Sequence, residues 1–276
     1  MKILFVTDLH GRKWKYDRLY KVAVDFGADV VINGGDMLPK DGDLFDEQRE
    51  FVTNYLDCHF AQFDAAGIYY LCYLGNDDVK ILDNLFDKMC RKHFFIVCLA
   101  QRIFEINGFE FIGMNWVVDY PFRLKDRCRI DTKDYVFQEQ FGTGLLSAPD
   151  GWKEIRDWFS YAKTLPTIED ELRCLPCPQD MIRSVYVIHM PPYKLGLDEC
   201  GYGPKVGSRA VYDFLQKYQP RLSLHGHIHE SPGVSVKWYA KLERTICIQP
   251  GQLDPFTYVT IDLDTLEFER HIETNW

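Results

Sequence analysis

The sequence has no excess of positive charge and no long hydrophobic run. Its 276 residues include 32 Lys and Arg against 41 Asp and Glu, a net charge of -9. Without a basic field to attract nucleic acid or anionic membranes, we expect no extended nucleic-acid surface and no membrane partner. The apolar start reaches Asp8 and His10 within ten residues, which fits neither a signal peptide nor a membrane span. We therefore expect a soluble, cytoplasmic protein.

The cysteines follow no pattern typical of a disulfide framework or a zinc ribbon. There are nine at irregular spacings, which favours reduced thiols, and the one C-x2-C pair, Cys174 and Cys177, has no second pair at zinc-ribbon spacing. Repeats and low-complexity tracts are also absent. What the chain does have is 46% apolar and 15% aromatic residues, enough for a sizeable core in one large domain or two small ones.

The first hundred residues alternate apolar runs with segments whose apolar residues recur at helical spacing. The runs at Lys2–Thr7, Asp29–Asn33 and Ile68–Leu74 predict strands, and each is followed by a predicted helix. The helices are predicted by Leu19, Val22, Ala23 and Phe26; by Val52, Tyr55, Leu56, His59, Phe60 and Phe63; and by Ile81, Leu82, Leu85, Phe86 and Met89. Because the strand runs are continuously apolar, we expect a parallel sheet covered by helices.

The pattern changes after residue 100. Asn107-Gly108 separates two strand-like runs and predicts a β-hairpin. Residues 115–180 are irregular, with one predicted amphipathic helix through Trp152, Ile155, Phe159 and Ala162, and we expect this segment to be an insertion that caps a single domain spanning 1–276. The alternation then resumes with a strand at Ser184–Ile188, a helix at Ala210–Tyr218 and a strand at Arg221–Leu224, before tail strands at Arg244–Ile248, Thr257–Leu263 and Glu267–Ile272.

Asp and His residues follow five of the predicted strands. Since ligands of open α/β sheets bind at the carboxyl ends of strands, these loops can converge on one point, and Asp and His are ligands of divalent metals. The loops are Asp8-Leu9-His10, Gly34-Gly35-Asp36, Gly75-Asn76-Asp77-Asp78, His189 and Gly226-His227-Ile228-His229. Taken singly, D-x-H and G-D are usual in turns, and a lone His189 is typical of a hydrogen-bonded core residue. Their conjunction favours a metal site.

The ordered set D-x-H, G-D, G-N, H and G-H-x-H resembles the calcineurin-like metallophosphoesterase superfamily. That resemblance implies a four-layer α/β/β/α sandwich of two mixed sheets flanked by helices, with two divalent metal ions at one edge. It assigns Asp8, His10 and His229 to one metal, Asn76, His189 and His227 to the other, and Asp36 to both. The segment Gly196–Ser208 and the run Ile248–Gly251 look similar to a prokaryotic branch of the family.

The implied activity is hydrolysis of phosphomonoesters or phosphodiesters, with diesters favoured, by a hydroxide that bridges two metals such as Mn, Fe, Zn or Ni. A carboxylate shared by two cations can hold them about 3.5 to 4 Å apart, and water between them is nucleophilic at neutral pH. The implied partner is a small phosphate ester, a class that includes nucleotides. Asn76, Asp77 and His189 are the candidate catalytic residues.

Asp77 departs from the family pattern. The usual motif continues Gly-Asn-His, and that His stabilises or protonates the leaving oxygen, whereas this chain has Gly75-Asn76-Asp77. Either burial raises the pKa of Asp77 so that it can donate a proton, or the enzyme prefers leaving groups that need none.

Other candidates are cations and aromatic residues in loops. Arg12, Lys205, Arg123, Arg127 and Arg129 are candidate contacts for substrate phosphate, although loop cations are more often only solvated. Aromatic residues at Trp116, Tyr120 and Phe122 could stack on a base or pack under the insertion, and His225 is expected to be a packed or outer-sphere histidine.

Two functions remain open from the sequence. The first is the metal-dependent phosphoesterase. The second is a binding or scaffold protein, because the family includes a retromer subunit that keeps the fold, lacks the same histidine and works by contacting partners. A degenerate scaffold tends to lose ligands, and this chain retains all seven.

Overall fold

Two six-stranded sheets form the centre of the protein in a computed structural model that describes residues 1–201 and 203–274. In the first sheet, β1 to β4 are parallel and the two C-terminal strands pair antiparallel beside β1. Its order is β16 (Glu267–Glu273), β15 (Phe256–Asp262), β1 (Lys2–Val6), β2 (Val30–Asn33), β3 (Tyr69–Cys72) and β4 (Ile96–Cys98).

The second sheet has a parallel centre and an antiparallel strand at each edge. Its order is β13 (Tyr239–Leu242), β14 (Thr245–Ile248), β12 (Leu222–Leu224), β11 (Ser184–Ile188), β6 (Phe109–Met114) and β5 (Ile103–Ile106). The hairpin predicted at Asn107-Gly108 joins β5 to β6, and the positive φ angles of 51° and 75° at these residues are those a tight hairpin turn requires.

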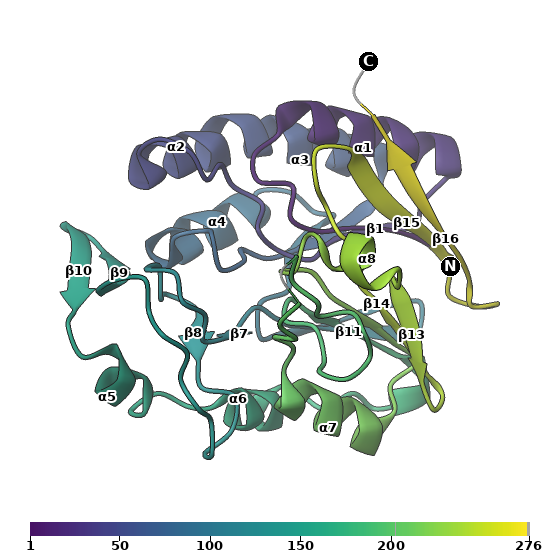
Figure 1. The fold of residues 1–276 in the computed structure, drawn as a ribbon. Helices are drawn as coiled ribbons and strands as arrows, with labels where there is room; N and C mark the ends of the chain where they lie inside the picture. Colours follow the sequence, from purple (N-terminus) through teal and green to yellow (C-terminus); the bar gives the residue numbers. More distant parts are fainter. Residues whose placement is uncertain (202, 275–276) are drawn as a thin grey trace.

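Helices cover the outer face of each sheet, as Figure 1 shows with α1 to α3 along the top and α6 and α7 along the bottom. The first sheet is covered by α1 (Lys13–Phe26), α2 (Leu44–Glu50), a π-helical turn η1 (Phe51–Leu56), α3 (Asp57–Ala66), a 3-10 turn η2 (Lys80–Leu82) and α4 (Asp83–Cys90). The second is covered by α6 (Ile168–Cys174) and α7 (Arg209–Tyr218), with short turns at η3 (Met181–Arg183) and α8 (Ser231–Ser235) elsewhere. The four-layer sandwich predicted from the sequence is confirmed.

The strands are continuously apolar because both faces of each sheet are buried. In β1, Ile3 and Phe5 lie in the core between the two sheets, whereas Leu4 and Val6 pack against the helices. Strand β11 divides in the same way, with Val185 and Val187 facing the other sheet. This packing explains why apolar runs rather than alternating patterns located the strands.

The segment predicted to be an insertion, residues 115–180, which we continue to call the insertion, adds no strand to either six-stranded sheet, and the structure describes all of it. Besides α6, which covers the second sheet, it carries two small sheets and one further short helix, most of which lie to the left in Figure 1. These elements are β7 (Val117–Val118), β8 (Cys128–Arg129), β9 (Gly144–Ala148), β10 (Gly151–Ile155) and α5 (Trp158–Ala162).

The helix predicted through Trp152 and Ile155 is wrong in its first half. Those residues belong to β10, which pairs with β9, and helix α5 begins only after Asp157, whose side chain accepts a hydrogen bond from the Ser160 amide. Such an N-terminal cap fixes where a helix begins. Helix α6 was not predicted, although Thr167 and Asp170 form a capping box at its start.

None of the helices in the described residues combines the length and the apolar character that a membrane crossing needs.

Candidate metal centre

Five loops at the carboxyl ends of β1, β2, β3, β11 and β12 carry the candidate ligands. Their side chains form two groups whose ligand atoms lie within 4.8 Å of one another. The groups are Asp8, His10, Asp36 and His229, and Asp36, His189 and His227. The structure therefore brings together all the Asp and His residues that the resemblance implied, and Asp36 belongs to both groups.

Asn76 completes the second group. Its Oδ1 atom lies 3.0 Å from His189 Nε2 and 2.7 Å from His227 Nδ1. An amide oxygen between two imidazole nitrogens is a suitable third ligand for a divalent cation, so this arrangement matches the set of Asn76, His189 and His227.

Unpartnered polar atoms show that the site fits a cation. Asp8 Oδ2, His10 Nδ1 and Asp36 Oδ2 are buried without a hydrogen-bond partner. Buried polar atoms are normally paired, and carboxylates that converge without donors repel one another. A bound cation satisfies these atoms together, which is why the residues present fit a metal centre.

The ligand loops have strained backbones. Asp8, His10, Asp36 and His227 have positive φ angles of 58°, 45°, 50° and 70°. Residues with side chains rarely adopt this region, and where they do the surrounding structure must hold them there, typically at functional sites. The adjacent Gly75 is required sterically, because a Cβ atom there would lie 2.1 Å from Asp36 Oδ1.

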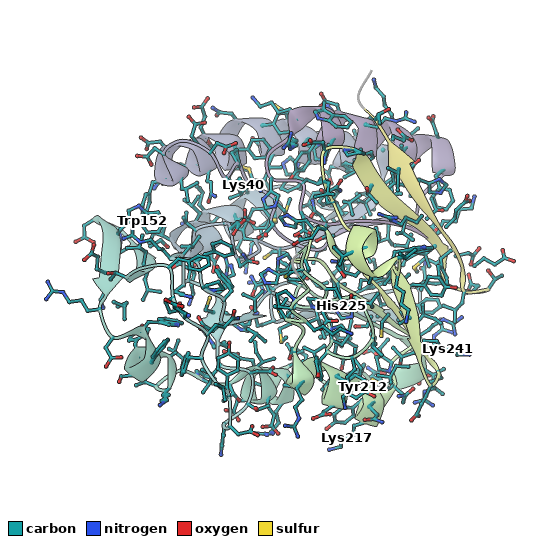
Figure 2. All side chains as sticks on the ribbon, in the orientation of Figure 1. Lys40, Trp152, Tyr212, Lys217, His225 and Lys241 are labelled. Atoms are coloured by element: carbon teal, nitrogen blue, oxygen red, sulfur yellow. The ribbon has the colours of Figure 1, made fainter. Side chains whose placement is uncertain are left out.

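Backbone carbonyls orient two of the histidines. His189 Nδ1 lies 2.7 Å from the Gly34 carbonyl, to which it donates, so Nε2 is left to face the carboxylates of the site. His225 is buried, and its Nδ1 lies 2.9 Å from the Ile188 carbonyl. Because His225 is in neither ligand group, it is a packed histidine beside the site; Figure 2 labels it near the middle of the molecule.

Burial and neighbouring charges shift the pKa values of the candidate ligands in opposite directions. Burial lowers the pKa of His10 to about 4 and that of His227 to about 3, so both are neutral, as metal ligands must be. Burial opposes protonation of His189 too, but Asp36 and Asp8 raise its pKa to about 9. Burial alone would raise the pKa of Asp36, yet His189 holds it well below its usual range. Asp36 is therefore a carboxylate throughout the neutral range.

Asp77 and Asp78 have different environments although they are adjacent. The Asp78 carboxylate is buried and accepts hydrogen bonds from the amides of Met37, Leu38 and Gly75, so it ties the loop of Asp36 to the loop of Asn76. No pattern in the sequence pointed to this role. The side chain of Asp77 is 35% exposed and its Oδ2 lies 4.0 Å from His10 Nδ1. Partial loss of hydration, and then the charge of Asp36, raise the pKa of this partly exposed carboxyl group to about 7.

The Arg and Lys side chains predicted to contact substrate phosphate lie in different environments. Arg12 Nη2 lies 3.3 Å from Oδ1 of the exposed Asp254, and Lys205 Nζ lies 3.1 Å from Glu199 Oε1. Arg123 is exposed and donates to the Thr143 carbonyl. Arg127 and Arg129 are 1% and 6% exposed, so neither guanidinium faces solvent.

Each of the two buried arginines, Arg127 and Arg129, has an acidic partner. Arg129 pairs with Glu171 at 2.9 Å and stacks over the Trp116 ring. Arg127 pairs with Asp83, and its Nε donates to the Gly75 carbonyl at 2.7 Å. Gly75 precedes the candidate ligand Asn76, so Arg127 links the insertion to a loop that carries candidate ligands.

We predict that Arg127→Met weakens metal binding about 10- to 100-fold, the usual cost of losing a residue that positions a ligand. Calorimetric titration with Mn²⁺ measures this directly. Arg127→Lys is expected to recover only part of the affinity, because one ammonium cannot replace a planar guanidinium at both Gly75 and Asp83.

The matched control for this variant is Arg173→Met, which removes an arginine on α6 that is 65% exposed. The positioning role is refuted if Arg127→Met lowers the unfolding temperature but binds Mn²⁺ with the affinity of the wild type.

Comparison of the chain with known proteins identifies a family with the same kind of site. The family model of calcineurin-like phosphoesterases matches residues 1–231. No curated protein has a significant sequence match to the chain.

Solved structures share the fold at low identity. One, at 16% identity, has a TM-score of 0.64 and covers 99% of both chains. The protein TT1561 of Thermus thermophilus has 17% identity and a TM-score of 0.58 over 98% of both chains. A dimetal phosphatase from Danio rerio has 12% identity and a TM-score of 0.50, covering 94% of this chain and 91% of its own. With the family model matching most of its length, the chain belongs to the calcineurin-like phosphoesterase family.

Proposed function

We propose that this protein is a dinuclear metal-dependent phosphoesterase that hydrolyses small phosphate esters and prefers diesters to monoesters. The observation that carries the proposal is that Asp36 belongs to two groups of ligand side chains at once. Two cations bound there would activate water and neutralise phosphate oxygens. The similarity in fold to a dimetal phosphatase supports the same conclusion.

The residues around the centre have separate tasks in this proposal. Hydrolysis adds a water oxygen to phosphorus and breaks the bond to the leaving oxygen, which departs as an anion or takes up a proton. Asn76 and His189 belong to the second group of ligand side chains and would hold one of the two cations. The Asn76 amide also donates to Asp77 Oδ1 at 2.9 Å. Asp77 would face the leaving oxygen, because it stands where related motifs have His.

The test is hydrolysis of bis(4-nitrophenyl) phosphate by metal-free protein loaded in turn with Mn²⁺, Fe²⁺, Zn²⁺ and Ni²⁺. We expect nitrophenolate release with at least one of these metals, suppression by a chelator, and slower release from 4-nitrophenyl phosphate. Protein that binds two metal ions per chain and hydrolyses neither ester with any metal would instead support the scaffold interpretation.

A further inference from the structure

Two exposed phenylalanines lie side by side on the insertion. Phe122 is 62% exposed and Phe141 is 68% exposed, and their ring centroids are 5.5 Å apart in an edge-to-face arrangement. Single exposed apolar residues are common, but two large aromatic rings in contact and both open to solvent are a feature that folding alone does not explain.

These rings continue inward to the metal centre. The Tyr120 ring lies 5.8 Å from Phe122 and 5.7 Å from the ring of His227, one of the candidate ligands. Tyr120, Phe122 and Phe141 therefore form one continuous row of rings, which we call the aromatic strip; Tyr120 is buried at its inner end, and the two phenylalanines are its exposed part. It runs from the ligands of the second group to solvent.

The strip is held in place by its backbone and by Tyr120. The Phe141 amide donates to the Pro121 carbonyl at 2.8 Å, and the Leu145 amide donates to the Arg123 carbonyl at 2.7 Å, so the two segments that carry the phenylalanines are joined. The Tyr120 hydroxyl donates to the Leu124 carbonyl at 2.7 Å. Because this hydroxyl is already engaged, the strip offers aromatic rings rather than hydrogen bonds.

We propose that the aromatic strip binds a planar aromatic group on the substrate, so that the preferred substrates are phosphodiesters whose non-leaving group carries an aryl ring or a nucleobase. This inference rests on the proposed phosphoesterase function. Aromatic rings recognise one another by offset stacking or edge-to-face contact, and a base stacked on an aromatic side chain is held without sequence-specific hydrogen bonds. The net charge of -9 argues against a long nucleic acid and favours a small diester.

The experiment compares three diesters that share the 4-nitrophenolate leaving group and differ in the other substituent: methyl, hexyl, and the 5′ carbon of thymidine. A common leaving group keeps the chemical step similar, so differences in kcat/KM report mainly on the other substituent. We expect the wild type to favour the thymidine diester over the methyl diester on the order of tenfold, the size of one stacking contact.

The double variant Phe122→Ala with Phe141→Ala is expected to lose that preference, so that its kcat/KM for the thymidine diester falls to the level of its kcat/KM for the methyl diester. The matched control is Phe94→Ala, which removes a phenylalanine that is 80% exposed and lies outside the insertion. A binding measurement accompanies the kinetics: calorimetry of the metal-loaded protein with thymidine 5′-monophosphate and with ribose 5-phosphate. The double variant should weaken binding of the nucleotide alone.

The possible results distinguish aromatic specificity, a general apolar surface and a failure of the proposed phosphoesterase function. Equal kcat/KM for the thymidine and methyl diesters, or a preference that survives the double variant, overturns the proposal. A hexyl diester favoured as strongly as the thymidine diester overturns the aromatic specificity, because the strip would then be a general apolar surface. If no diester is hydrolysed, the proposed function fails, and calorimetry still decides whether the strip binds a base.

Discussion

Asp36→Asn is expected to abolish binding of both metal ions and all hydrolysis of phosphate esters. Among the described residues, Asp36 is the one shared by both groups of ligand side chains. Its low pKa keeps it charged, and an amide cannot offset the charges of two cations in the same way. The loss should exceed the ~10- to 100-fold cost of removing an outer-sphere partner.

The substitution is a clean test because Asn fits the backbone at this position. Asp36 has a φ of 50°, and Asn is among the few residues that tolerate that conformation. The Asn side chain can also accept the hydrogen bond that the Asp77 amide donates to Asp36 Oδ1 at 2.9 Å. We therefore expect a folded protein without metal.

Elemental analysis and titration with Mn²⁺ measure the outcome, and Asp41→Asn, at an exposed position in the same loop, is the control. A variant that binds both metals with the affinity and activity of the wild type would show that Asp36 does not bridge them. Loss of one metal only would assign Asp36 to a single site.

The sheets and the ligand loops could be predicted because their signals are local. A strand buried on both faces, such as β11, reads as an unbroken apolar run, and its bounds are those predicted. The turn at Asn107-Gly108 needs two residues that accept positive φ angles, and those residues are recognisable in the sequence. The ligands follow because parallel strands end at one edge of each sheet.

The insertion could not be predicted because strand pairing overrides its local pattern in one place and distant partners decide its structure in another. The spacing of Trp152, Ile155, Phe159 and Ala162 is helical, but pairing with β9 makes the first two residues part of a strand. Arg127 gives no sign of burial in the sequence, since the Asp83 and Gly75 groups that hold it are 44 and 52 residues away. Local pattern cannot distinguish such an arginine from the exposed Arg123.

Asp77→His is expected to accelerate hydrolysis of esters with poor leaving groups by ~10²- to 10⁴-fold, the usual contribution of a general acid. The wild type has no histidine at this position to assist departure of an alkoxide, whereas nitrophenolate leaves readily as an anion. An anionic Asp77 should also repel a monoester more than a diester, because the monoester carries more negative charge at neutral pH.

The measurement is a series of rates against the pKa of the leaving group. Wild-type protein should show a steep dependence, with aryl diesters hydrolysed much faster than alkyl monoesters, and Asp77→His should flatten it. Asp150→His, which replaces an exposed carboxylate between β9 and β10, should leave the slope unchanged.

The contrary outcome predicts a different result, because partial loss of hydration and then the charge of Asp36 raise the pKa of Asp77 to about 7. If Asp77 stays protonated in the active enzyme, it can donate to the leaving oxygen, and wild type already shows the shallow dependence. The protonated form is lost above its pKa, so activity on alkyl esters would fall as pH rises through that value. Asp77→Asn would then lose activity mainly on alkyl substrates, whereas an anionic Asp77 predicts that Asn is tolerated on them. Bound cations oppose protonation, so we expect the anionic form and the steep slope.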